Sequence, residues 1–190
     1  MIRDVYGWGW LELGFLSRRQ TILDAMNRRE DAGDFARAAR LARDLGIPVV
    51  AHVIFGLPSE PLAETAAAAS LMNRLGVWGV KLHNLYIVAD APLAAAWRRG
   101  EAEPPGLDDY VRAVCDFLER LDPACLVHRL VGEARADRLL APDWARDKAG
   151  ALEALRREFA RRGSHQGALY TKNVSSVDLG AAQDGNSRTE

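Results

Sequence analysis

The stretch that decides the fold runs from Pro48 to Glu60 and reads Pro-Val-Val-Ala-His-Val-Ile-Phe-Gly-Leu-Pro-Ser-Glu. It begins with a continuous apolar run that opens on proline, which is typical of a parallel strand buried on both faces. A helical pattern follows over residues 61–75, and a second strand-like run covers residues 78–88. This order of strand, turn, helix and strand predicts a right-handed crossover and a parallel sheet or barrel.

The same patterns of apolar residues predict the remaining elements. Upstream, residues 8–14 read as a strand, residues 18–27 as a helix that Ser17 could cap, and residues 34–44 as a second helix. Downstream, we expect a strand over residues 126–131 and helices over residues 91–99, 107–121 and 146–162. Residues 171–190 lack core periodicity and are expected to form a disordered tail.

Composition limits the classes of function. The chain has 190 residues, and its 25 lysines and arginines are balanced by 26 aspartates and glutamates, which gives a formal net charge of −1. That balance provides no attraction to nucleic acid or to an anionic membrane, and no apolar run is long enough for a membrane-spanning helix. No secretory signal is visible, so we expect a cytoplasmic location with reduced thiols. Two cysteines cannot supply the three thiolates that an iron–sulfur cluster usually takes.

Alternation along each predicted strand places four ionisable residues on one kind of face. This face carries Glu12 on the first strand, His52 and Ile54 on the second, and Lys81 and His83 on the third. The opposite faces are expected to pack against the crossover helices. Buried ionisable groups are costly unless they pair with one another or meet a ligand at the carboxyl ends of the strands. The face is therefore either a ligand site or a self-satisfied polar network.

The turn that follows the second predicted strand is the sharpest local feature. Glycine at position 56 would let a ligand approach the backbone closely, and Pro58 stiffens the turn. Ser59 or Glu60 could cap the next helix. Taken alone, such a turn is only weakly indicative of function.

Together, these segments resemble the radical S-adenosylmethionine (SAM) superfamily, in particular a bacterial branch near its elongator-type and oxygen-independent coproporphyrinogen-oxidase-type members. Residues 52–60 resemble the fifth-strand motif of that branch, residues 11–17 its fourth-strand Glu-Leu-Gly-x-Gln-Ser segment, and residues 79–85 its sixth strand. The family likeness continues in residues 26–28, 128–133, 140–144 and 161–167.

The resemblance implies a fold, a chemistry and a set of site residues. The fold is α/β, with the last three strands of a six-stranded (β/α) barrel over residues 1–100 and a small α+β extension over residues 101–170. The chemistry is the cleavage of SAM, with a 4Fe–4S cluster, to a 5′-deoxyadenosyl radical that abstracts hydrogen from a substrate. The implied cofactor-binding residues are Glu12, Ser17, His52, Ile54, Gly56, Leu57, Lys81 and His83. Glu12 and Ser17 would lie near the ribose and methionine portions of SAM, and the turn at Gly56 near its adenine.

The chain departs from the family where the cluster would bind. It has no Cys-x3-Cys-x2-Cys loop, and Cys115 and Cys125 are interpreted as buried structural thiols. Leu16 stands where the family has Gln, and Ser59 where it usually has the second Gly of the turn. We therefore expect a truncated or inactive fragment that joins a separate amino-terminal half, or associates with itself at an exposed strand edge.

Two other functions stay open on the sequence. A metal-dependent barrel hydrolase or lyase would use Glu12, His52 and His83, whose side chains suit zinc or manganese, although their spacing matches no metal motif. A non-catalytic remnant or binding module would use the helices at 107–121 and 146–162 for contacts. The sequence identifies no substrate.

Overall fold

The structure, a computed structural model, describes residues 9–31 and 33–171. The predicted tail lies outside these residues except for Thr171, and so does Trp8 at the start of the first predicted strand. No helix in the described ranges is both long enough and apolar enough to cross a membrane.

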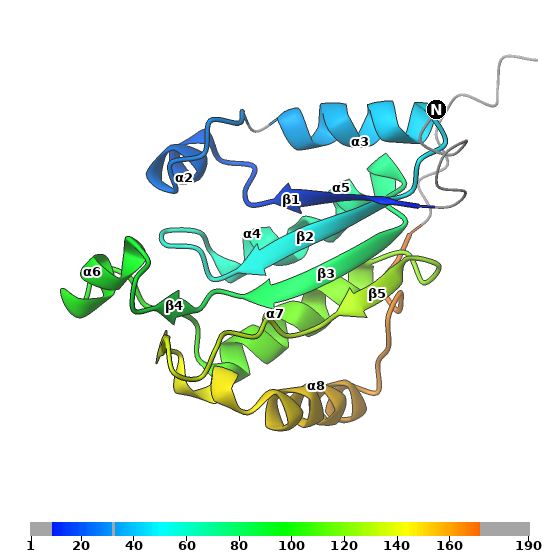
Figure 1. The fold of residues 1–190 in the computed structure, drawn as a ribbon. Helices are drawn as coiled ribbons and strands as arrows, with labels where there is room; N and C mark the ends of the chain where they lie inside the picture. Colours follow the sequence, from blue (N-terminus) through cyan, green and yellow to red (C-terminus); the bar gives the residue numbers. More distant parts are fainter. Residues whose placement is uncertain (1–8, 32, 172–190) are drawn as a thin grey trace, which may run out of the picture.

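The central sheet has four parallel strands. In spatial order they are β1 (Leu11–Phe15), β2 (Val49–Phe55), β3 (Gly79–Asn84) and β5 (Leu126–Arg129). Figure 1 shows these arrows side by side and pointing the same way. The predicted α/β class with a parallel sheet is therefore confirmed. Within the described residues the sheet has β1 and β5 at its two edges, so the predicted barrel and its boundary at residue 100 stay predictions.

The helices lie mainly on one side of this sheet. Their bounds are α2 Gln20–Ala25, α3 Asp34–Asp44, α4 Leu62–Ala67, α5 Ala69–Leu75, α6 Leu93–Arg98, α7 Leu107–Arg120 and α8 Lys148–Arg162. In Figure 1, α4, α5 and α7 lie behind the strands, and α8 packs on α7. At the end to which the strands point stand α2 and α6. A short 3-10 helix, Asp143–Arg146, precedes α8.

The core fills the space between the sheet and the helices behind it. Phe55 at the end of β2 makes edge-on contacts with Tyr110 and Phe117 of α7, with ring centroids 5.8 and 5.9 Å apart. All three side chains are fully buried, and the Tyr110 hydroxyl donates a hydrogen bond to the Leu130 carbonyl at 2.5 Å. This bond satisfies the one polar atom that the aromatic cluster brings into the core.

Two predicted elements are divided in the structure. The helix predicted over residues 61–75 is interrupted at Ala68, whose N–H bonds to the Thr65 carbonyl three residues back. The strand predicted over residues 78–88 leaves the sheet after Asn84, and β4 (Ile87–Val88) pairs antiparallel with β6 (Leu139–Ala141), a strand not predicted from the sequence. The other predicted elements are present, with ends shifted by a few residues.

Candidate functional site

The polar face predicted from alternation is present in the sheet. The register places Gly14, His52 and Lys81 side by side in one row across β1, β2 and β3. Glu12 lies two residues before this row on β1, and His83 two residues after it on β3. Because residues two apart on a strand share a face, all four ionisable side chains lie on the side of the sheet opposite the aromatic core.

Glu12 is the centre of this polar face. Lys81 Nζ donates to both of its carboxylate oxygens at 2.6 and 2.7 Å, His52 Nε2 lies 2.7 Å from Oε2, and Trp10 Nε1 donates to Oε1 at 3.0 Å. The hydrogen bonds from Lys81, Trp10 and His52 lower the pKa of Glu12 to about 2. Glu12 is therefore ionised at neutral pH, and since a carboxylate only accepts, His52 must carry its proton on Nε2.

His83 lies beside this cluster in its neutral form. Its ring stacks on that of His52 with centroids 5.5 Å apart, and Arg129 Nη1 lies 3.5 Å from its Nε2 atom. Burial, followed by the charges of Arg129, His52 and Lys81, lowers the pKa of His83 to about 4. His83 is thus a proton acceptor at neutral pH, placed next to His52 and Lys81, two of the three donors to the Glu12 carboxylate.

The predicted residues Ile54 and Leu57 lie in a small apolar cluster at the end of the same face. Leu57 is buried and Ile54 is half-buried. The side chains packed with them come from α2, α6 and the strand ends: Leu16, Ile22, Met26, Leu85 and Leu93. The polar cluster is therefore bordered on the carboxyl side by a water-excluding surface.

Gly56 is required by a protein neighbour. Its φ is +91°, and a Cβ atom added to it would collide with the ring of Pro105. The close approach that the sequence suggested for a ligand is made here by Pro105, which explains the glycine without a cofactor. The role of Gly56 in cofactor binding stays a prediction.

Ser17 and Glu60 form a second polar contact at this end of the sheet. The Ser17 hydroxyl donates to Glu60 Oε1 at 2.5 Å and accepts from the Arg19 N–H at 3.0 Å. The expected capping role of Ser17 is therefore wrong, because α2 begins after Arg19 without a side-chain cap. Neither Ser59 nor Glu60 caps the next helix either, which begins after Pro61. Burial raises the pKa of Glu60, and its Oε2 atom is buried without a hydrogen-bond partner.

Arg28 adds an unpartnered donor to the same region. One of its terminal nitrogens pairs with Glu30 at 3.0 Å, and the same nitrogen would lie 3.5 Å from a Cβ added to Gly14. Its Nε atom is buried and donates to no partner. Residue patterns on the strands could not reveal Arg28 as a neighbour of the polar face, because it lies outside the strands. They could not reveal Arg129 either, because its contact with His83 depends on a register shift between β3 and β5.

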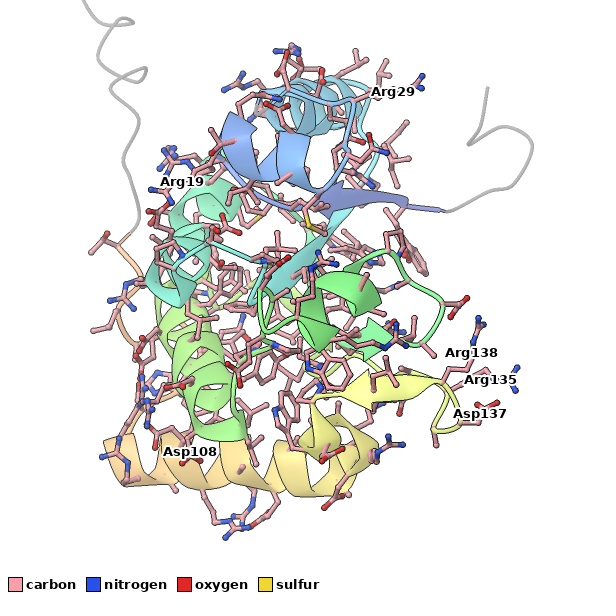
Figure 2. All side chains as sticks on the ribbon, turned by 90° about the vertical axis from the view of Figure 1, so that its left-hand side faces the viewer. Arg19, Arg29, Asp108, Arg135, Asp137 and Arg138 are labelled. Atoms are coloured by element: carbon pink, nitrogen blue, oxygen red, sulfur yellow. The ribbon has the colours of Figure 1, made fainter. Side chains whose placement is uncertain are left out.

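Figure 2 looks onto the end to which the strands point. The labelled Arg19 projects outward on one side of this end, and Arg135 and Arg138 project outward on the other. Each of them is ion-paired: Arg19 with Glu64 at 3.2 Å, Arg135 with Asp137 at 2.9 Å, and Arg138 with Asp90. These arginines are therefore neutralised by neighbouring carboxylates at the rim, away from the polar cluster.

The metal-dependent alternative has no support in the geometry. Among the described residues, no group of three or more His, Cys, Asp or Glu side chains is placed to hold a metal ion. The polar face brings Glu12 and His52 into contact, but Lys81 occupies the carboxylate oxygens that a metal would need. Cys115 and Cys125 are buried, and burial raises the pKa of both thiols to about 12.

Comparison with known proteins gives a consistent result. Residues 77–161 match the family model described as Radical_SAM C-terminal domain. Protein YtqA of Bacillus subtilis is 32% identical over 163 residues, and protein YhcC of Escherichia coli K12 is 34% identical over 160 residues. These alignments cover 86% and 84% of this chain but 51% and 52% of the two relatives, so the chain spans about half the length of the curated relatives it matches.

A solved structure shares the fold. Elp3 of the archaeon Methanocaldococcus infernus, solved with residues 1–46 deleted, superposes with a TM-score of 0.75 at 18% identity. The superposition covers 86% of this chain and 38% of that protein. At this identity the likeness concerns the fold alone.

Proposed function

Since this chain carries a carboxyl-terminal region of the radical SAM superfamily, we propose that its polar face and the turn at residues 56–60 contribute part of a SAM-binding site. The observation that carries the proposal is the ionised Glu12, held by Lys81 and His52 at one face of the sheet. In this proposal, the four-stranded sheet is part of a barrel that further strands complete.

Two unpartnered polar atoms, one on Arg28 beside Gly14 and one on Glu60 in the turn after β2, fit the chemistry of SAM. The buried Glu60 Oε2 lacks a donor, and the buried Arg28 Nε lacks an acceptor. SAM offers both kinds of partner, since its ammonium and ribose hydroxyls donate and its carboxylate accepts. Leaving such atoms buried and unpaired is unfavourable, so a ligand that satisfies either of them would gain binding energy.

The other predicted residues would orient the cofactor and exclude water. Lys81 and His52 keep Glu12 ionised and fix the position of its carboxylate, which would orient the polar part of the ligand. Ile54 and Leu57 lie in the apolar cluster, where they would contact the uncharged part of the ligand. His83, neutral at this position, could accept a proton at Nε2. Bound SAM would supply the 5′-deoxyadenosyl group of the family's radical chemistry, and the electron would come from a 4Fe–4S cluster held outside this chain.

A 4Fe–4S cluster does not fit the described residues. Cluster ligation takes three thiolates in this family, whereas Cys115 and Cys125 are buried thiols on the helical side. In our proposal the cluster belongs to a separate amino-terminal segment or chain, and this chain alone does not start radical chemistry. The outer edge of β1 is where we propose that such a segment, or a second copy, would pair; no nucleic acid or membrane partner is proposed, and the setting would be the cytoplasm.

A titration followed by two-dimensional NMR tests the SAM site. The ¹⁵N-labelled chain is titrated with SAM to millimolar concentration, which detects even the weak binding expected of part of a site. We expect the amide signals of Glu12, Gly56 and Leu57 to shift together, while those of α8 stay unchanged. Shifts confined to other regions, or none at these positions, would contradict the proposal.

A matched pair of variants sharpens this test. Glu60→Gln replaces the carboxylate that carries the unpartnered Oε2 atom. It should weaken SAM binding, because this carboxylate is the acceptor for the ligand's donors. Glu64→Gln, four residues on, removes an exposed carboxylate that pairs with Arg19 and should leave the titration curve unchanged. Equal effects of the two substitutions would show that binding reflects overall charge rather than this site.

A further inference from the structure

A cavity of about 600 Å³ lies among the helices and is lined by residues of α3, α5, the end of α7 and the segment 169–171. Because α5 and α7 lead into β3 and β5, this cavity lies toward the amino ends of the strands. The turn at residues 56–60 lies at their opposite ends. The two regions share no lining residue. We propose that this cavity binds a small phosphate ester, independently of the SAM site.

Arginine dominates the charge of the cavity. Arg40 from α3, Arg74 from α5 and Arg120 from α7 all line it, and no aspartate or glutamate does. None of the three makes an ion pair with a described carboxylate. By contrast, Arg37 and Arg43, the neighbours of Arg40 on α3, both pair with acidic residues. Three uncompensated guanidinium groups at one cavity repel one another, and an anion would remove that cost.

Helix ends account for only part of this arrangement. Arg74 and Arg120 stand in the last turns of α5 and α7, where a cation also interacts with the free carbonyls, and Arg120 donates to the Asp116 carbonyl at 2.6 Å. Arg40 has no such role, because it lies in the middle of α3. Asp122, which accepts from the Ala124 N–H at 2.8 Å and from Tyr170, makes no ion pair with any of the three arginines.

The rest of the lining indicates a phosphate that is attached to an organic group. Planar guanidinium groups bind phosphate oxygens through paired N–H donors, and the Ser70 hydroxyl can add another. Leu169, 55% exposed, and the ring of Tyr170 give the cavity an apolar wall. A volume of about 600 Å³ lies within the range of small-molecule sites, and it exceeds what inorganic phosphate alone would fill.

Calorimetry with uridine diphosphate, uridine and pyrophosphate tests the inference on the full chain. These probes avoid adenine, so their binding does not report on the SAM site. We expect uridine diphosphate to bind, pyrophosphate to bind more weakly and uridine not to bind detectably. Raising the NaCl concentration should weaken uridine diphosphate binding, because charge attraction is screened.

Single substitutions identify the site. Arg40→Ala and Arg74→Ala should each weaken uridine diphosphate binding about tenfold, since each removes a charge-assisted contact. Arg98→Ala is the matched control, because Arg98 stands in the last turn of α6 without an ion pair and outside this cavity; it should bind like the wild type. Thermal melts would show that the variants, all at exposed positions, remain folded. Unchanged affinity in both cavity variants would overturn the proposal, and so would a short RNA that binds more tightly than uridine diphosphate through the same arginines.

Discussion

At the scale of single residues, His83 couples the polar face to pH. Its pKa of about 4 in the folded chain lies below the ordinary value of 6.5, because of burial and the neighbouring charges of Arg129, His52 and Lys81. The unfolded chain therefore binds more protons between pH 6.5 and pH 4, and stability falls as the pH drops through this window. After allowance for solvent screening, we expect a loss of about 1 kcal/mol between pH 7 and pH 5.

The variant His83→Gln should remove this part of the pH dependence, measured as the difference in urea unfolding free energy between pH 7 and pH 5. Glu12 does not interfere, because its pKa is lowered to about 2 and its contribution is lost only below about pH 4.5. Arg129→Gln removes one of the charges that lower the His83 pKa, so the slope should decrease in part. An identical slope in wild type and His83→Gln would refute this account.

A second residue-scale prediction concerns Gly56. Gly56→Ala should destabilise the chain by about 3 kcal/mol, because it adds the cost of positive φ to a collision with Pro105. Gly100→Ala is the control, since Gly100 also has positive φ (+73°) but an added Cβ there has no atom within 4 Å. It should cost about 1 kcal/mol. Urea unfolding followed by tryptophan fluorescence measures both values, and equal losses would show that Pro105 does not constrain the turn.

At the scale of elements, the strands were largely predictable from their apolar runs, whereas their ends depend on contacts that are distant in sequence. β3 ends at Asn84, whose side-chain oxygen accepts from the Gly132 N–H at 3.0 Å. Nothing between residues 78 and 88 indicates this contact. The three residues of β6 are too few to show any alternation, and they form a strand only because β4 lies beside them.

The pairing of α7 with α8 leads to a stability prediction at the same scale. Arg162 on α8 is 18% exposed and pairs with Asp116 and Glu119 on α7 at 2.6 and 3.1 Å. Arg162→Ala leaves these carboxylates unpaired at a partly buried position and should cost about 3 kcal/mol. Arg156→Ala, on the same helix, removes an arginine that is 72% exposed and should cost less than about 0.5 kcal/mol. Denaturant midpoints would separate the two, and similar losses would mean that the interhelical pairs add little.

At the scale of the whole molecule, the sequence predicted only some of the residues that meet at the candidate site. Alternation correctly placed Glu12, His52, Lys81 and His83 on one face, because side-chain direction in a strand follows from sequence position alone. It could not place Arg129, which reaches His83 from β5 across a register shift in the β3–β5 pairing. Nor could it show that α2 and α6 would close the apolar end of the face, since that depends on how loops direct helices in three dimensions.

The open sheet makes self-association the main prediction for the isolated molecule. β1 is an edge strand within the described residues, and Leu11 at its start is 40% exposed. A parallel edge with free backbone donors and acceptors pairs readily with another chain. We expect the purified chain to form dimers or larger species in sedimentation velocity at micromolar concentration.

Charge on the edge should reverse this association if β1 causes it. Leu11→Lys places a lysine on the edge strand, where an added chain would have to desolvate it, and should shift the distribution toward monomer. Leu152→Lys provides the control, because Leu152 is similarly exposed (37%) but lies on α8. If both variants dissociate equally, association depends on general hydrophobicity rather than on strand pairing. A monodisperse, stable wild-type monomer would instead mean that the β1 edge is protected without any partner, and the proposal that a further segment completes the sheet would lose its physical basis.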